Sequence, residues 1–235
     1  FPFVDNWPWW GGIAELAAFR GKTQKEFFTD PQVRDDYKQI VRTVLNRVNT
    51  LTGVRYTDDK AILCWELGNE LAAPKAWVVE MAAFIKKEDT NHLVAESYFT
   101  APDDPSVDIV QDHLYQGDPV KMLEPINTHA KQVEGKKVYW VGEFGFISNE
   151  GMLAILDNVI QNKAFTGAMM WCFRFHNQDG GFYWHIDHGK TQSFQSFYWP
   201  GFPILEGYGQ KRFMNLVREK AFQIQGLTPP PITPP

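Results

Sequence analysis

Short apolar runs alternate with segments of helical periodicity along most of this chain, and that alternation constrains the fold more than any other feature. Runs so short and so continuously apolar are typical of strands buried on both faces of a parallel sheet. Consecutive parallel strands are joined by right-handed crossovers that usually contain a helix. The sequence therefore predicts an α/β fold with about six parallel strands, over residues 1–4, 61–67, 92–95, 107–111, 137–141 and 166–171.

The helix after the first predicted strand has the clearest start signal. Asp30 is a good N-cap, Pro31 follows at the first helical position, and apolar residues then recur at helical spacing as far as Val48, before Gly53. Further helices are predicted over residues 74–87, 120–133, 152–161 and 210–223. We expect one domain over residues 1–226 and a proline-rich tail over 227–235 that cannot continue a helix.

Charge and hydropathy argue against several classes of partner. The 235 residues carry a formal net charge of -5 with lysines and arginines scattered, so we expect no nucleic-acid surface. No run reaches the ~20 apolar residues of a membrane span, and no signal peptide opens the chain, so localisation is left open. Cys64 and Cys172 lie inside apolar runs, where free cysteine behaves as a small hydrophobe.

Two glutamates, Glu70 and Glu143, each close an apolar run. A carboxylate at the mouth of a buried strand is costly unless it is paired or used in chemistry. The ends of parallel strands meet at one edge of a sheet, so the two side chains can come together there. Two carboxylates about 5 Å apart are what retaining glycoside hydrolysis requires, one as the acid and the other as the nucleophile.

Aromatic residues make up 15% of the chain, and many lie in polar or glycine-rich segments where no core periodicity explains them. Flat aromatic faces beside polar groups suit sugar rings. Aromatic side chains tucked under long loops are an equally open interpretation of any one of them. Among these residues, Trp7 and Trp10 near the N-terminus are candidates for a sugar-binding groove.

Four segments in register resemble the strand ends of glycoside hydrolase family 5: WELGNE at 65–70, DHLY at 112–115, VGEFG at 141–145 and the apolar run ending in Trp171. They match its fourth, sixth, seventh and eighth strands. The segments FTDP at 28–31, LNRVN at 45–49 and TGV at 52–54 are similar to the third helix of its β-mannanase and β-glucanase branch. DNW at 5–7 with Gly11 and Gly12 resembles the loop after its third strand.

The resemblance implies a (β/α)8 barrel fold, no metal or other cofactor, and hydrolysis of β-1,4-linked mannan, β-glucan or cellulose. It makes Glu70 the acid/base and Glu143 the nucleophile. The acid/base requires a raised pKa, whereas the nucleophile must stay ionised. The remaining implied roles are a partner of the sugar 2-hydroxyl for Asn69, a platform under the reacting sugar for Trp171, a hydrogen bond to Glu143 for Tyr115, and a pocket-lining position for His113. A secreted or periplasmic location also follows from the family.

Several of these residues have a purely structural alternative. Glu66, on the same strand as Glu70, fits a buried or paired structural carboxylate better than a catalytic one. Taken without the resemblance, His113 and Trp171 fit core positions. The segment HIDH at 185–188 invites a metal interpretation, but no helix is predicted to hold its histidines on one face. We expect His185 to lie in the substrate groove or to hydrogen-bond within its loop.

The sequence also departs from the family pattern. Leu71 stands where the family has a proline after the acid/base, and Phe1 aligns with the start of the third strand. The first two strands, and an arginine near the end of the second, have no counterpart. An incomplete barrel with strands three to eight leaves open edges at residues 1–4 and 166–171. Self-association, or cover from residues 193–209 and the tail, would protect them. A catalytically inactive carbohydrate-binding remnant is the alternative function.

Overall fold

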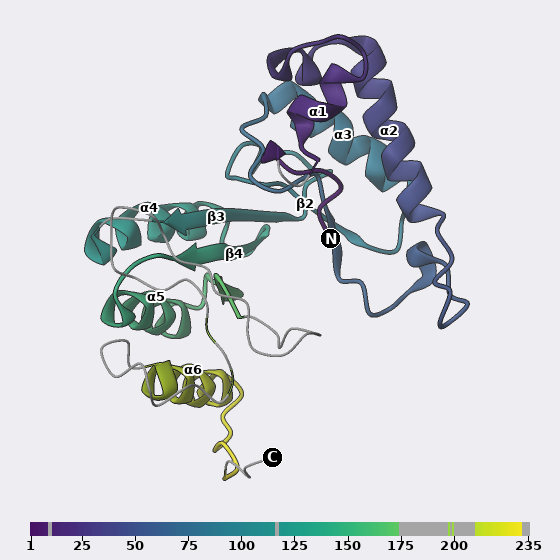
Figure 1. Cartoon of the computed structure of the whole chain (residues 1–235). Coiled ribbons are helices and arrows are strands. Elements are labelled where there is room, and N and C mark those ends of the chain that lie inside the picture. The colour runs from purple at the N-terminus through teal and green to yellow at the C-terminus, as the bar shows by residue number, and fades with distance from the viewer. Residues whose placement is uncertain (9–10, 116–117, 174–196, 198, 200–209, 232–235) are drawn as a thin grey trace. The chain divides into compact units, whose positions relative to one another are not determined.

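The computed structural model describes the whole chain except residues 9–10, 116–117, 174–196, 198, 200–209 and 232–235 (Figure 1). It divides into two compact units. The first contains Phe1–Asp112 and Val133–Tyr139, and the second contains His113–Gln132 and Trp140–Pro235. The expectation of one domain over residues 1–226 stays a prediction.

The strands form one sheet in the order β1-β2-β3-β4-β5. Their bounds are Cys64–Glu66 for β1, Leu93–Ala95 for β2, Ile109–Tyr115 for β3, Val138–Gly145 for β4 and Gly167–Met170 for β5. β1 pairs with β2, β2 with β3, and β4 with β5, each in parallel. The order follows the chain because every connection returns to the neighbouring position. The predicted parallel α/β fold is confirmed.

The predicted strand at residues 1–4 is replaced by two isolated parallel bridges, Pro2 with Glu66 and Asp5 with Asn69. The Phe3 amide donates to the Glu66 carbonyl at 3.1 Å, and the Glu66 amide donates to the Phe1 carbonyl at 2.9 Å. In this register the backbone nitrogen of Pro2 faces away from β1, so its missing N–H breaks no bond to that strand. The segment therefore lies beside β1 as expected, but without a continuous ladder.

Two predicted strands end too early. The prediction stopped one at residue 111 and another at 141, whereas β3 continues to Tyr115 and β4 to Gly145. The added residues include His113 and Glu143, whose polar side chains interrupt the apolar pattern. Backbone pairing continues beyond the apolar run because ladder hydrogen bonds do not depend on the side chain. His113, Tyr115 and Glu143 consequently lie on the strands themselves.

The first unit contains α1 (Ile13–Ala18), η2 (Gln24–Phe28), α2 (Pro31–Leu45), η3 (Tyr56–Asp58) and α3 (Lys75–Glu88). The Asp30 side chain accepts the N–H groups of Gln32 and Val33, which confirms the predicted N-cap of α2. α2 and α3 pack side by side (Figure 1). The short α1, η2 and η3 were missed because one or two turns carry too little periodicity.

Aromatic side chains fill the core of the first unit. The rings of Phe3 and Trp65 stack at 5.5 Å, and Tyr37 meets Trp77 edge-on at 5.0 Å. Burying such rings stabilises the unit by roughly 2 kcal/mol or more apiece.

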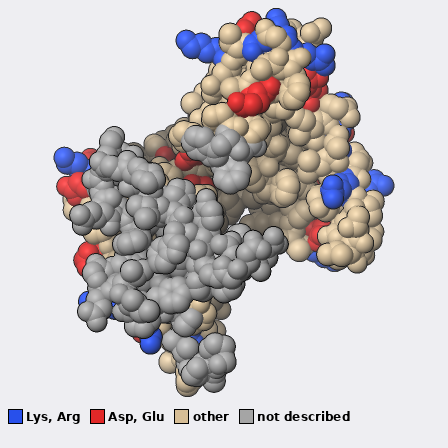
Figure 2. All heavy atoms as spheres, viewed as in Figure 1, with Lys and Arg blue, Asp and Glu red and all other residues tan. Residues whose placement is uncertain are grey.

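On the face shown in Figure 2, acidic and basic side chains of the described surface are interspersed.

The second unit contains α4 (Pro119–Val133, whose last residue the division assigns to the first unit), α5 (Asn149–Gln161) and α6 (Gln210–Ile224). α5 and α6 pack together, and Lys220 donates to Asp157 across them. Phe197 bridges Phe173 in parallel, and its buried ring contacts Phe213 at 4.7 Å. One residue of the 193–209 segment thus lies beside the chain that follows β5. Among the described helices, none is long and apolar enough to cross a membrane.

Candidate active site

The backbone around Glu70 is held unusually tightly. The Leu67 carbonyl accepts the buried Tyr37 hydroxyl at 2.8 Å, and the Asn69 amide donates to the Val4 carbonyl at 2.8 Å. Glu70 itself has φ = 54°, a left-handed conformation that is uncommon for a residue with a side chain. Such a conformation persists only when the surrounding structure enforces it, and it is concentrated at functional sites.

Gly68 is required by this packing. A Cβ atom there would lie 2.6 Å from Leu71 Cδ1 and 2.8 Å from both the carbonyl oxygen and Cγ2 of Val4. Only glycine allows the chain to pass so close to Val4. Contact with the N-terminal segment therefore fixes the path of the chain two residues before Glu70.

The side chains around Glu70 form a connected group within the first unit. Trp7 Nε1 donates to Glu70 Oε2 at 2.7 Å. Asp5 accepts the Trp7 backbone N–H at 2.7 Å through Oδ1, and it accepts Asn69 Nδ2 at 3.1 Å through Oδ2. Trp7, Asn69 and Glu70 therefore lie together, and their roles stay predictions. Asp5 was not predicted to take part, although it stands in the DNW segment that carries the family resemblance.

Glu66 is engaged in the way its structural interpretation expects. Gln111 Nε2 donates to Glu66 Oε1 at 2.6 Å and to the Glu96 carbonyl at 2.9 Å. Glu66 is therefore a paired carboxylate inside the sheet. On the next strand Tyr139 donates to Asp112 at 2.6 Å, and burial together with this neighbouring charge raises the pKa of Tyr139 far above its ordinary value.

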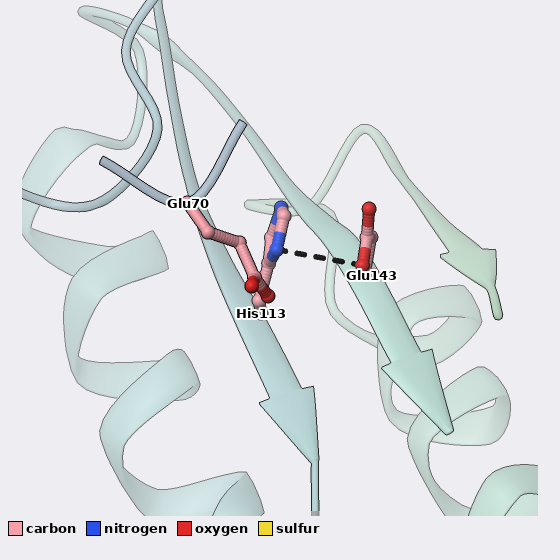
Figure 3. A group of neighbouring side chains, drawn as sticks. All are labelled: Glu70, His113 and Glu143. Atoms are coloured by element: carbon pink, nitrogen blue, oxygen red, sulfur yellow. Dashed lines mark ion pairs between the residues drawn. The ribbon is translucent and has the colours of Figure 1, made fainter. Parts of the chain in front are cut away.

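Glu143 lies on β4 in the second unit, with partners on β3. The Tyr115 hydroxyl donates to Glu143 Oε2, which is the predicted contact. His113 Nδ1 lies 3.6 Å from the same oxygen, as drawn by the dashed line in Figure 3. The side chain of His113 is only 4% exposed, whereas that of Glu143 is 21% exposed. A protonated His113 and the Tyr115 hydroxyl would both stabilise an ionised Glu143.

Trp171 follows β5 directly. Its backbone N–H donates to the Phe144 carbonyl at 2.8 Å, and a Cβ atom on Gly145 would lie 2.6 Å from the Trp171 carbonyl oxygen. Trp171 is therefore tied by its backbone to the residues just after Glu143. Its role as a sugar platform stays a prediction.

Some of the predicted residues lie outside the part of the chain that the structure describes. Trp10, His185 and the HIDH segment at 185–188 lie outside the described residues. Cys64 and Cys172 are buried free cysteines, as expected. Within each unit the structure brings the predicted residues together, Trp7 and Asn69 around Glu70 in the first, and His113 and Tyr115 around Glu143 in the second. The meeting of the two glutamates stays a prediction.

Comparison with solved structures shows the class of fold. The chain is similar to an endo-β-1,4-mannanase from Thermotoga petrophila, with a TM-score of 0.77 and 23% identity over 94% of this chain and 57% of that one. It is also similar to a family 5 mannosidase from Rhizomucor miehei, with a TM-score of 0.76 and 19% identity over 96% and 72%. The fold is therefore of the (β/α)8-barrel type.

Sequence comparison indicates a family within this class of fold. Residues 3–113 match the family described as "GH family 5 beta-mannosidase-like". Mannan endo-1,4-β-mannosidase 4 of Solanum lycopersicum is 44% identical over 105 residues, 39% of this chain and 26% of that protein. Mannan endo-1,4-β-mannosidase 7 of Arabidopsis thaliana is 42% identical over 106 residues, 39% and 25%. The matches thus span about a quarter of these relatives' length, and residues 3–113 are similar to glycoside hydrolase family 5.

Proposed function

We propose that this chain cleaves β-1,4-linked mannan by double displacement, with Glu70 as acid/base and Glu143 as nucleophile. The observation that carries the proposal is the state of Glu70 inside the matched range 3–113. It has left-handed backbone, its carboxyl is held by Trp7, and the adjacent Asn69 is bound to Asp5. A strained residue fixed from several directions is typical of a catalytic position.

Glu143 stands near the carboxyl end of β4, and Glu70 follows the carboxyl end of β1 in the same parallel sheet. In a (β/α)8 barrel this is the end that carries catalysis. A separation of about 5 Å between their carboxyl groups would give retention of configuration, whereas a wider gap would admit a water and give inversion. Retention is the outcome that the proposal requires.

In the first step, a Glu143 oxygen attacks the anomeric carbon while the bond from that carbon to the leaving oxygen breaks. Glu70 gives its proton to the leaving oxygen, so the leaving sugar departs as an alcohol. The Tyr115 hydroxyl donates to Glu143, and His113 Nδ1 lies beside the same oxygen, so both are placed to stabilise a negative charge on Glu143. The product of this step is a glycosyl ester on Glu143.

In the second step, the ionised Glu70 takes a proton from water, whose oxygen attacks the anomeric carbon and releases Glu143 as a carboxylate. Both enzyme groups return to their starting states. Asn69 assists both steps if its amide binds the sugar 2-hydroxyl, because hydrogen bonds near the reacting carbon strengthen in the transition state. Its bond to Asp5 fixes the orientation of that amide.

Mannan is preferred to β-glucan as the substrate because both curated relatives described above are named for mannan, and the two solved structures are a mannanase and a mannosidase. Trp10 and His185, both predicted to contact the sugar, lie outside the described part of the chain, so a panel of substrates provides the test. We expect release of reducing ends from soluble β-mannan and much less from a soluble cellulose derivative or mixed-linkage glucan.

The central test replaces Glu70→Gln and Glu143→Gln, each expected to abolish mannan hydrolysis while the far-ultraviolet circular dichroism spectrum stays unchanged. Glu134→Gln is the matched control, because Glu134 is an exposed acid outside the proposed site. Full activity in either test variant would refute the assignment. If the wild-type chain binds manno-oligosaccharides, seen by tryptophan fluorescence, but releases no reducing sugar, it is the carbohydrate-binding remnant instead.

A further inference from the structure

Glu96 is a buried carboxyl group that the mechanism above does not use. It follows β2 directly and is 0% exposed. Its Oε1 accepts the backbone N–H groups of Thr100 and Ala101 at 3.0 and 3.1 Å, and its Oε2 accepts the Ala101 N–H at 2.8 Å. The carboxyl group therefore closes the connection after β2 into a tight loop on its own strand end.

The next residue, Ser97, connects this ordered loop to the segment that precedes Glu70. Ser97 is 4% exposed, and its hydroxyl donates to the Gly68 carbonyl. Gly68 is the residue whose contact with Val4 leaves no room for a side chain. The loop fixed by Glu96 and the segment that leads to Glu70 are thus joined through a buried hydroxyl group, in addition to the backbone hydrogen bond from Leu67 to Ala95.

A buried carboxyl is an expensive way to close a loop, since an uncharged side chain would avoid the loss of hydration. Burial raises the pKa of Glu96 to about 7, and Asp112 acts in the same direction, while the backbone donors and the charge of Lys75 oppose it. Groups that are costly for stability are concentrated where function requires a fixed geometry.

We propose that Glu96 and Ser97 are positioning residues that hold the Gly68 carbonyl and thereby fix the left-handed backbone of Glu70. This inference rests on the proposed role of Glu70 as acid/base. The Glu96 carboxyl group orders the loop, and the Ser97 hydroxyl group connects the loop to Gly68. The orientation of the Glu70 carboxyl group is fixed as a result. Neither residue touches the substrate.

The kinetic test compares Ser97→Ala and Glu96→Gln with the wild-type chain on soluble β-mannan. Displacing a catalytic acid by a fraction of an ångström lowers the rate of the chemical step more than it lowers substrate binding. We therefore expect kcat to fall about tenfold, with KM changed by less than about twofold. Ser106→Ala is the control, because Ser106 is a half-buried serine further along the same connection. A variant with lowered stability but wild-type kcat would overturn the proposal.

Amide hydrogen exchange gives a readout that needs no activity. The Leu67 and Asn69 amides donate to Ala95 and Val4, so the peptide covering residues 67–71 is protected in the wild-type chain. We expect its exchange to accelerate at least about fivefold in Ser97→Ala and in Glu96→Gln, but not in Ser106→Ala. Unchanged exchange would refute the connection. A wild-type chain that hydrolyses no mannan would refute the proposed function alone.

Discussion

The two proposed catalytic glutamates are held by different means. Glu70 depends on the path of the backbone: a left-handed φ, a glycine with no space beside it, and hydrogen bonds from a segment more than sixty residues earlier in the chain. Glu143 lies within β4, although the register of β4 to β5 shifts between Val141 and Phe144, and partners on β3 hold its carboxylate. A strand fixes its side chains by register, whereas a turn needs support from elsewhere.

This difference has a consequence for sensitivity to mutation. Substitutions that disturb Glu143 should act through the chemistry of single side chains. Those that disturb Glu70 should act through the scaffold, and several distant substitutions should resemble one another in their effects. The following predictions test that contrast, from the largest expected effect to the smallest.

Tyr115→Phe removes the hydroxyl that donates to Glu143 and should have the largest effect. A lost hydrogen bond to a catalytic carboxylate typically costs 1.5 to 3 kcal/mol, so we expect kcat on mannan to fall about a hundredfold. The ring packing against Phe146 remains, and the unfolding midpoint in urea should hardly move. Tyr56→Phe in η3 is the control. If Tyr115→Phe keeps activity near that of the wild type, the Tyr115 hydroxyl group does not control the reactivity of Glu143.

Gly145→Ala, at the end of β4 and two residues after Glu143, should be costly for stability. The added Cβ would lie 2.6 Å from the Trp171 backbone carbonyl oxygen, which cannot rotate away. Such overpacking costs about 2 to 3 kcal/mol, to be measured by urea unfolding. Gly167→Ala on β5 is a matched control with nothing within 4 Å of its Cβ, so it should cost nothing. Equal stability of the two variants would contradict the close approach of Trp171.

Glu96→Gln should change how stability depends on pH. The pKa of Glu96 is raised to about 7 in the folded state, above its ordinary 4.5, so the native protein keeps this proton after the unfolded chain has lost it. Its stabilising contribution is fully present below the unfolded pKa and is lost as pH rises through about 7. Between about pH 5.5 and pH 8, the unfolding free energy of wild type should fall by about 2 kcal/mol more than that of Glu96→Gln.

Glu134→Gln serves as the control for that experiment, because its exposed carboxyl group is not part of the network. The difference between wild type and Glu96→Gln cancels the other titrating groups, which are common to both proteins. Parallel pH dependences of the two proteins would show that Glu96 is not the buried titrating group.

Trp7→Phe should give the smallest effect. It removes the indole N–H that donates to Glu70 and keeps an aromatic ring in place. A donor favours the ionised form of a carboxyl group, so its loss should move the alkaline limb of the kcat/KM profile upward by about half a pH unit. Trp199→Phe, on a partly exposed ring of the second unit, is the comparison. A limb that moves downward would contradict the proposed support of Glu70.

Much of the fold could be predicted from local pattern. The Asp30 cap followed from its residue type ahead of Pro31, the start of α6 at residue 210 from helical periodicity, and the parallel strands from short apolar runs. The errors arose where another interaction overrode the pattern. β3 and β4 continue through polar residues because backbone hydrogen bonds between strands do not depend on the side chains. Beside β1, the pairing of residues 1–5 is reduced to isolated bridges.

The site divides in the same way. Glu70, Glu143, Asn69 and Tyr115 were found because they stand in motifs at strand ends. Asp5 and Ser97 were missed because their partners lie 64 and 29 residues away, and no local spacing records such a contact. Glu96 had a usable signal, since it is a carboxylate that closes an apolar run, as Glu70 and Glu143 are.

The sequence by itself determined the class of fold and the identity of the two candidate glutamates, because apolar periodicity and strand-end motifs are local properties of a chain. Only the tertiary structure decided how each glutamate is held. Trp7 and Asp5 reach the Glu70 segment, and Tyr115 reaches Glu143, through hydrogen bonds that form only after distant segments pack together. Local pattern selects the residues, and long-range packing sets their geometry.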